Sequence, residues 1–134
     1  MSLYLLDTNM ASHAIRGDLP RVRERLIALP IHSAAVSAVT RGELKYGLAK
    51  RGSPVSLSAL VHEFLIRIEV LPWTGEVADV YGTLKASCRS EGINLDALDM
   101  MIAAHAVATE ATLVTRDKSF SYVGRGLKID DWSA

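Results

Sequence analysis

The chain has 134 residues, of which 49% are hydrophobic and 22% are charged. This composition excludes a disordered chain and predicts one folded domain spanning residues 1–134. No apolar run approaches the ~20 residues needed to cross a bilayer, and the opening residues lack the basic stretch of a secretion signal. With Cys88 as the single cysteine, we expect no disulfide framework and a cytoplasmic protein.

Charge is balanced overall but unevenly distributed along the chain. The 15 basic and 15 acidic side chains give a net charge of zero. Residues 1–51 carry a net charge of +4, and residues 52–134 carry −4. A basic half can present a surface to phosphate groups even in a neutral chain, although a solvated helix face explains the same pattern.

The hydrophobic pattern alternates between short strands and longer helices. Strands are predicted at Leu3–Leu6, Ile31–Val36, Ile68–Leu71, Thr112–Thr115 and Leu127–Ile129. Helices are predicted at Met10–Arg16, Pro20–Leu29, Ala38–Lys50, Val55–Arg67, Thr74–Ser90 and Asp96–Glu110. This alternation predicts an α/β fold with a mainly parallel, twisted sheet of about four to five strands and helices on both faces. Sites in such folds form at the carboxyl ends of the strands.

Four carboxylates lie where that rule places a site. Asp7 and Asp117 follow predicted strands, Glu43 lies on the helix after the second strand, and Asp99 lies in the first turn of another helix. Each also fits a local structural role. Asp7 and Asp96 suit helix caps, residues 40–43 match a capping box that includes Glu43, and Asp117 suits a turn.

The helical periodicity favours a shared site for two of these acids. Glu43 interrupts an apolar stripe between Val39 and Tyr46, and Asp99 borders the stripe of Leu98 and Ile102. A carboxylate that points inward is costly unless it is paired or binds a cation. No lysine or arginine occupies these inward positions, so a divalent metal is the natural counter-charge. All-oxygen ligands favour Mg²⁺ or Mn²⁺.

Histidine and cysteine do not form a second metal-binding pattern. The four histidines are scattered, and His105 lies on an apolar stripe, which predicts a core histidine with a backbone partner. Cys88 lies on another apolar stripe and is predicted to pack in the core. The sequence contains no glycine-rich phosphate loop.

Four segments together resemble the motifs of PIN-domain nucleases, and most closely the VapC toxins of bacterial toxin–antitoxin pairs. The matching stretches are Leu5-Leu6-Asp7-Thr8-Asn9, residues 37–47 around Glu43, residues 99–106 from Asp99, and Leu113-Val114-Thr115-Arg116-Asp117. Their order and spacing span nearly the whole chain. Relatives often carry Gly-Pro shortly before the third motif, where this chain has Asp96-Ala97, so Asp96 is either a fifth acid or a helix cap.

The resemblance implies a PIN-like fold and an Mg²⁺- or Mn²⁺-dependent endoribonuclease. It implies Asp7, Glu43, Asp99 and Asp117 as metal-site acids, with Asn9 and Thr115 in support. The candidates for RNA contact are Arg16, Arg41, Lys45 and Arg116, and the expected RNA is a tRNA cut at its anticodon stem-loop. The resemblance further implies a VapB-type antitoxin, a homodimer, and a larger complex that binds promoter DNA through the antitoxin.

Other α/β classes are compatible with parts of this pattern. A phospho-receiver domain needs a lysine at a later strand end, where Lys118 is out of register. A phosphatase of the Asp-x-Asp class needs a second acid at position 9, where this chain has Asn9. A non-catalytic RNA-binding domain of the same fold remains open as an alternative function.

Overall fold

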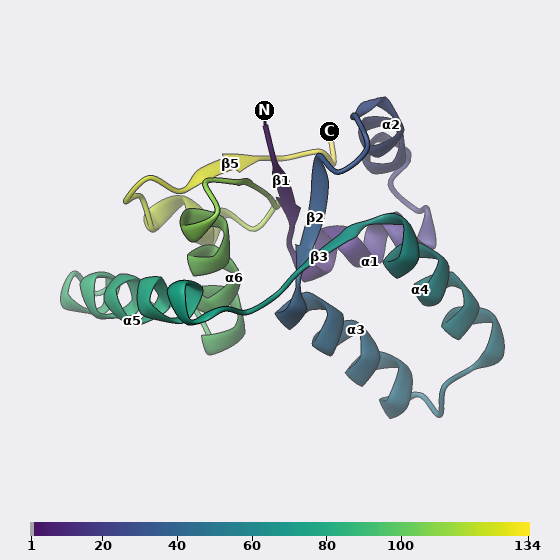
Figure 1. The fold of residues 1–134 in the computed structure, drawn as a ribbon, viewed down its shortest axis with the longest axis horizontal. Helices are drawn as coiled ribbons and strands as arrows, with labels where there is room; N and C mark the ends of the chain where they lie inside the picture. Colours follow the sequence, from purple (N-terminus) through teal and green to yellow (C-terminus); the bar gives the residue numbers. More distant parts are fainter. Residues whose placement is uncertain (1) are drawn as a thin grey trace.

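The computed structural model describes residues 2–134 and forms one five-stranded, all-parallel sheet between two groups of helices (Figure 1). The strand order is β3-β2-β1-β4-β5. The strands are β1 (Tyr4–Leu6), β2 (Ala34–Ser37), β3 (Glu69–Leu71), β4 (Thr112–Val114) and β5 (Lys128–Asp130). The fold class expected from the sequence is confirmed.

Six α-helices and one short 3₁₀ helix connect the strands. The helices are α1 (Thr8–Arg16), α2 (Pro20–Ala28), α3 (Ala38–Lys50), α4 (Val55–Arg67), α5 (Gly75–Ser90), α6 (Ala97–Ala108) and the 3₁₀ helix η1 (Lys118–Tyr122). None of the helices in residues 2–134 combines the length and apolarity that a membrane span requires.

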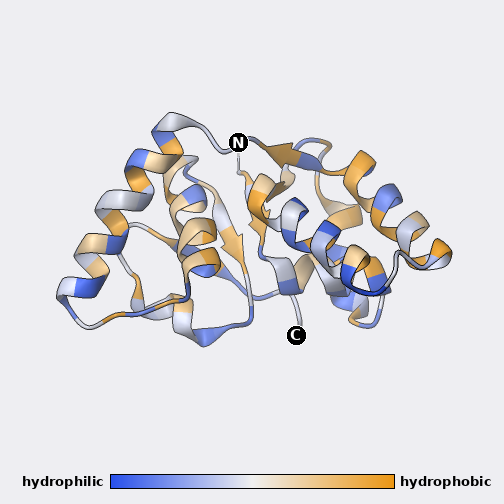
Figure 2. Ribbon diagram, turned by 90° about the horizontal axis from the view of Figure 1, so that it is seen from below, coloured by the Kyte–Doolittle hydropathy of each residue, from blue (hydrophilic) through white to orange (hydrophobic). Residues whose placement is uncertain are grey.

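Each strand contributes side chains to both faces of the sheet. Leu5 and Leu113 point into one buried cluster with α5 and α6, while Leu6 and Val114 point into the other with α1, α3 and α4. Successive strand residues face opposite sides, so covering both faces requires apolar residues at every position. Figure 2 shows this pattern, with apolar strands and helices that alternate between apolar and polar residues.

The second strand begins later than the sequence predicts. The expected strand started at Ile31, but Ile31 is 83% exposed and His32 adopts a left-handed conformation with φ of 70°. Residues 31–33 therefore form a turn, and pairing with β1 begins only at Ala34. The apolar side chain of Ile31 therefore lies on the surface, in a turn, and does not begin a strand.

The chain reverses its direction of strand addition at β1. It adds β2 and β3 on one side of β1, then returns to place β4 and β5 on the other side. Such a switch point leaves a crevice at the carboxyl edge of the sheet, where ligands bind in open α/β folds. Asp7 directly follows β1, and its backbone N–H donates to Val114 O on β4 at 3.0 Å. The fold therefore places Asp7 at this crevice.

Candidate active site

Asp7 combines a local structural role with a place in the acidic cluster. Its carboxylate caps α1 by accepting the Met10 backbone N–H at 2.8 Å, so the predicted cap is confirmed. The residue is only 4% exposed. Burial raises the pKa of Asp7, while the Thr115 hydroxyl and the Met10 N–H oppose the rise by hydrogen bonding to the carboxylate; the negative charges of Asp117 and Glu43 raise it further.

Asp99 lies in the first turn of α6 and is half-buried. Burial, followed by the charges of Asp96, Asp117, Asp7 and Glu43, raises the pKa of Asp99 to about 6. The four acids predicted from the sequence therefore act on one another electrostatically, although they come from four separate segments. Asp96 caps α6 by accepting the Asp99 N–H at 2.9 Å, which confirms the cap interpretation of this residue.

Glu43 is held by the hydroxyl of Thr8, a contact that the sequence pattern did not predict. Thr8 donates to Glu43 Oε1 at 2.6 Å, and its hydroxyl also lies 3.1 Å from that of Thr40. The predicted capping box at residues 40–43 is wrong, because α3 begins earlier with Ser37 as its cap, and Thr40 is fully buried inside the helix. Thr8 directly follows Asp7 in the sequence, and this position next to a site acid is the feature from which a role for Thr8 could have been predicted.

Asp117 is exposed and caps η1, as the predicted turn required. It accepts hydrogen bonds from the Ser119 N–H at 2.9 Å and the Ser119 hydroxyl at 2.7 Å. These two bonds lower the pKa of Asp117 by stabilising its charged form. Its own N–H donates to the Thr115 hydroxyl at 3.0 Å, so Thr115 contacts two of the acid positions.

The remaining predicted residues have different surroundings. Asn9 is exposed on α1, and Arg41 and Lys45 are exposed on α3. Arg16 forms an exposed ion pair with Asp18 and lines a small hollow of about 130 Å³ that also contains Thr8, Glu43 and Arg51. Arg51 was not among the predicted RNA contacts, although it caps the helix that carries Glu43 and follows Glu43 by eight residues, a spacing that places both near one face of α3.

The carboxylates share one edge of the sheet without forming a closed coordination shell. In the part of the chain that the structure describes, no three acidic, histidine or cysteine side chains are grouped closely enough to hold one ion. Two carboxylates repel by about 4 kcal/mol at ~4 Å and an effective dielectric of ~20, so a bound cation would stabilise a closer arrangement of the acids. The donor set consists of hard carboxylate oxygens, which fits a divalent ion such as Mg²⁺ or Mn²⁺.

The histidine and cysteine predictions have different outcomes. Cys88 is fully buried in the core, as expected. His105 is also buried, but the predicted backbone partner is wrong: its Nδ1 lies 2.7 Å from the side-chain oxygen of Ser37. The two residues are 68 positions apart, so this contact depends on tertiary packing.

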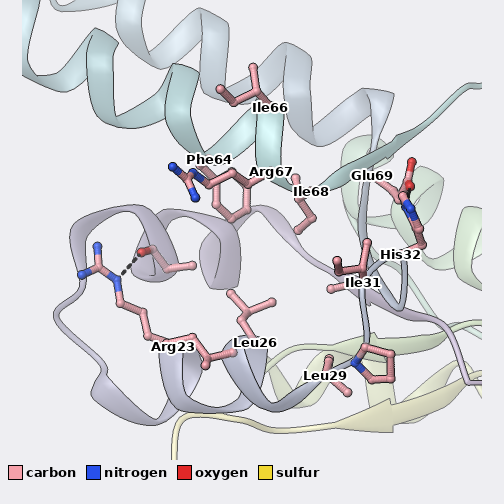
Figure 3. Close-up of a pocket in the computed structure, with 14 residues that line it drawn as sticks. Arg23, Leu26, Leu29, Ile31, His32, Phe64, Ile66, Arg67, Ile68 and Glu69 are labelled. Atoms are coloured by element: carbon pink, nitrogen blue, oxygen red, sulfur yellow. Dashed lines mark hydrogen bonds and ion pairs between the residues drawn. The ribbon is translucent and has the colours of Figure 1, made fainter.

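A larger cavity of about 660 Å³ lies away from the acids, between α2, α4 and the start of β3 (Figure 3). Figure 3 shows Leu26, Ile31, Phe64 and Ile68 turned toward the hollow, with the paired His32 and Glu69 at one end. Ile27 and Ile66 also line it and remain 84% and 61% exposed. An apolar hollow of this size is typical of a binding surface.

A model of the PIN domain matches residues 4–126. The chain belongs to the PIN-domain family. It is 34% identical over 134 residues to the tRNA(fMet)-specific endonuclease VapC of Shigella flexneri, a match that covers 99% of this chain and 100% of that protein. This full-length match places the chain among the VapC proteins of the family.

Solved structures agree with this assignment. The chain superposes on VapBC2 from Rickettsia felis, bound to a promoter DNA fragment, with a TM-score of 0.90 and 28% identity over 97% of this chain and 98% of that one. It matches DNA-bound VapBC from Salmonella typhimurium with a TM-score of 0.90 and 32% identity over 98% and 99% of the two chains. The PIN-like fold expected from the sequence motifs is therefore confirmed.

Replacing Asp99 by asparagine should stabilise the metal-free protein. The pKa of Asp99 in the folded chain, about 6, lies above its ordinary value of 3.8, so its ionisation opposes folding. Two pKa units correspond to about 3 kcal/mol in an enclosed site, and the partial exposure of Asp99 reduces this to about 1 kcal/mol. We expect Asp99→Asn to unfold at higher urea concentration at pH 7.5 in EDTA.

The sign of this effect fixes its pH dependence. The destabilisation by Asp99 is complete above pH 6, declines as the pH falls, and vanishes below 3.8. The gain in unfolding free energy of Asp99→Asn should therefore shrink as the pH falls from 7.5 to 4. Asp79→Asn, an exposed change on α5, is the matched control. An equal gain at both pH values would show that charge repulsion is not its source.

Proposed function

We propose that this chain is the toxin of a type II toxin–antitoxin pair, a cytoplasmic endoribonuclease that hydrolyses RNA phosphodiester bonds with Mg²⁺ or Mn²⁺. The observation that carries the proposal is the electrostatic convergence of Asp7, Glu43, Asp99 and Asp117 at the switch point of the sheet. The names of full-length relatives, a tRNA(fMet)-specific endonuclease and a ribonuclease, support the reaction. We propose that residues 1–134 act as one domain.

Carboxylates in this arrangement supply what phosphodiester hydrolysis requires of the protein. Asp7 and Asp99 would hold the principal metal ion, with Asp117 and Glu43 completing the site. A bound ion supplies charge neutralisation on the phosphate and activation of water. Thr8 donates a hydrogen bond to Glu43 Oε1. Glu43 Oε2 would then accept a hydrogen bond from the attacking water. Thr115 would support the site through its bonds to Asp7 and Asp117, and Asn9 would do so from the start of α1.

Basic side chains on or beside the elements that carry the acids suit an RNA backbone. Arg16 lines the hollow beside Glu43, Arg41 and Lys45 are exposed on the helix that carries Glu43, and Arg116 immediately precedes Asp117. Such contacts position the phosphates and depend strongly on salt, while specificity requires the shape of a loop or unpaired bases. The name of the tRNA(fMet)-specific relative supports a tRNA as the substrate. We propose that the tRNA is cut at its anticodon stem-loop.

Cleavage of RNA is the direct test of this function. Purified protein is incubated with total bacterial RNA and Mn²⁺ or Mg²⁺, beside identically purified Asp99→Asn and Asp79→Asn variants and an EDTA sample. We expect discrete fragments from the wild type and Asp79→Asn, abolition by EDTA, and a loss of about 100-fold or more in Asp99→Asn, because that variant removes a metal-site carboxylate.

The fragment ends would identify the RNA and the position of the cut. If Asp99→Asn cleaved as well as the wild type, the assignment of Asp99 would be wrong. If no sample cleaved RNA but the protein retained tRNA in a filter-binding assay, the non-catalytic alternative would replace the proposed enzyme.

Loss of the Thr8 hydroxyl should slow the reaction without preventing substrate binding. Thr8→Val keeps the side-chain shape but removes the hydrogen bond that orients Glu43, and a bond to a charged group contributes about 1.5 kcal/mol. We expect kcat to fall about tenfold with little change in KM, and Thr8→Ser to retain most of the rate. Equal rates for Thr8→Val and the wild type would contradict a role of Thr8 in orienting Glu43.

The cavity between α2 and α4 suits the protein partner of such a toxin. We propose that a VapB-type antitoxin places apolar side chains there. Relatives solved as VapBC complexes support such a partner, and the apolar lining of the cavity supports this position. We also propose that the chain forms a homodimer, and that the complex with the antitoxin binds promoter DNA through the antitoxin. Relatives solved on promoter or other DNA support the last step.

Substituting the cavity wall should weaken the toxin–antitoxin complex selectively. Ile66→Glu places a charge in the apolar lining, whereas Val55→Glu places one on the same helix at a position 87% exposed and outside the cavity. With the antitoxin encoded beside this chain, we expect Ile66→Glu to weaken binding at least tenfold, because a charge buried in an apolar contact is costly. Val55→Glu should bind normally. Equal binding by both variants would place the antitoxin elsewhere.

A further inference from the structure

His105 links two helices that carry acids of the site, from a fully buried position. It lies in the last turn of α6 and is 1% exposed. Its Nδ1 lies 2.7 Å from Ser37 Oγ, the oxygen that caps α3 by accepting the Val39 N–H at 3.0 Å. The bond therefore connects the last turn of α6 to the residue that caps the start of α3.

The hydrogen-bond pattern assigns the roles of the two atoms. Because Ser37 Oγ accepts the Val39 N–H, its hydroxyl proton is available for His105 Nδ1. Burial lowers the pKa of His105, which favours the neutral ring, in which one nitrogen carries the proton and the other accepts a hydrogen bond. We assign Ser37 as the donor and Nδ1 as the acceptor, which puts the ring proton on Nε2.

The second ring nitrogen of His105, Nε2, lowers the stability that this side chain contributes to the core. Nε2 is buried and has no hydrogen-bond partner among residues 2–134. The ring packs edge-on against Trp73, with centroids 5.6 Å apart and an interplanar angle of 87°. A phenylalanine would make the same aromatic contact without an unpaired polar atom, whose burial costs about 1–3 kcal/mol. The benefit that offsets this cost lies at Nδ1.

The hydrogen bond between His105 and Ser37 lies the same number of residues from a site acid on α6 as on α3. Asp99 precedes His105 by six residues on α6, and Glu43 follows Ser37 by six residues on α3. Six residues span about 9 Å of helix, and the two helices pack against each other. A fixed contact at His105 and Ser37 thus limits how the two acid-bearing helices slide or separate.

We propose that His105 is a positioning residue that, through its hydrogen bond to Ser37, sets the spacing of Asp99 and Glu43 and so the affinity of the site for a divalent cation. This inference rests on the proposed function, because it assumes that the acids share a metal ion. Ser37 and His105 do not touch the ion. They act by holding α3 and α6 in register.

The test separates the acceptor from the bulk of the ring. His105→Phe keeps an aromatic ring against Trp73 but removes the acceptor, while His105→Asn restores an acceptor oxygen close to the position of Nδ1. Mn²⁺ binding to the full chain is measured by isothermal titration calorimetry. We expect His105→Phe to weaken Mn²⁺ binding about tenfold, a typical effect of losing an outer partner of a metal site, and His105→Asn to stay within about threefold of wild type.

Ser37→Ala tests the same bond from its other end and serves if His105→Phe does not fold. It should weaken Mn²⁺ binding about tenfold, and the double variant Ser37→Ala with His105→Phe should bind no more weakly than either single variant, since both remove one interaction. Leu84→Ala is the control for general loosening. Leu84 is 5% exposed in the same core, on α5, which packs against α6, and it makes no polar link to α3.

Each outcome decides the proposal. Wild-type affinity in a folded His105→Phe or Ser37→Ala variant overturns it, as does an Asn variant no better than the Phe variant. Equal weakening by Leu84→Ala shows that loss of stability alone is responsible and overturns it as well. Failure of the wild type to bind Mn²⁺ overturns the proposed function together with this inference, whereas normal wild-type binding with unaffected variants overturns this inference alone.

Discussion

The interaction on which the site depends is repulsion between carboxylates that the fold brings to one edge of a parallel sheet. The chain reverses its strand order at β1, so the ends of β1 and β4 meet, and helices that start at this edge bring Glu43 and Asp99 to them. Burial and the neighbouring negative charges raise the pKa of Asp7 and Asp99 together. The repulsion lowers the stability of the folded protein, and a bound cation would offset this loss. Local destabilisation of this kind is typical of functional sites.

Hydroxyl groups limit the cost of this arrangement. Thr115 bonds to the backbone at Asp117 and favours the charged form of Asp7, and Thr8 holds Glu43 from the first turn of α1. Ser37 caps α3 and contacts His105 on α6. Thr8 and Thr115 come from the same strand ends as Asp7 and Asp117, and Ser37 ends β2, so these polar partners gather at the carboxyl edge of the sheet.

The proposed catalytic and partner-binding surfaces occupy different parts of the molecule. The acids lie at the start of α1, in the middle of α3, in the first turn of α6 and just before η1, whereas the large apolar cavity is formed by α2, α4 and the turn before β2. The turn at residues 31–33 explains why an apolar residue was mistaken for the start of a strand: Ile31 belongs to the wall of this cavity. The periodicity of hydrophobic residues cannot distinguish an apolar side chain that packs in the core from one that lines a surface cavity, because both are hydrophobic.

The sequence by itself determined the alternation of strands and helices, the caps at Asp7 and Asp96, and, through four ordered motifs, the family and the candidate acids. These features are local, because caps, turns and hydrophobic periods depend on neighbours a few residues apart. Only the tertiary structure decided the contacts between distant segments: the bond from Thr8 to Glu43 and the pairing of His105 with Ser37. Those contacts join residues separated by 35 or more positions, and their partners are chosen by packing across the sheet, on which short-range patterns carry no information.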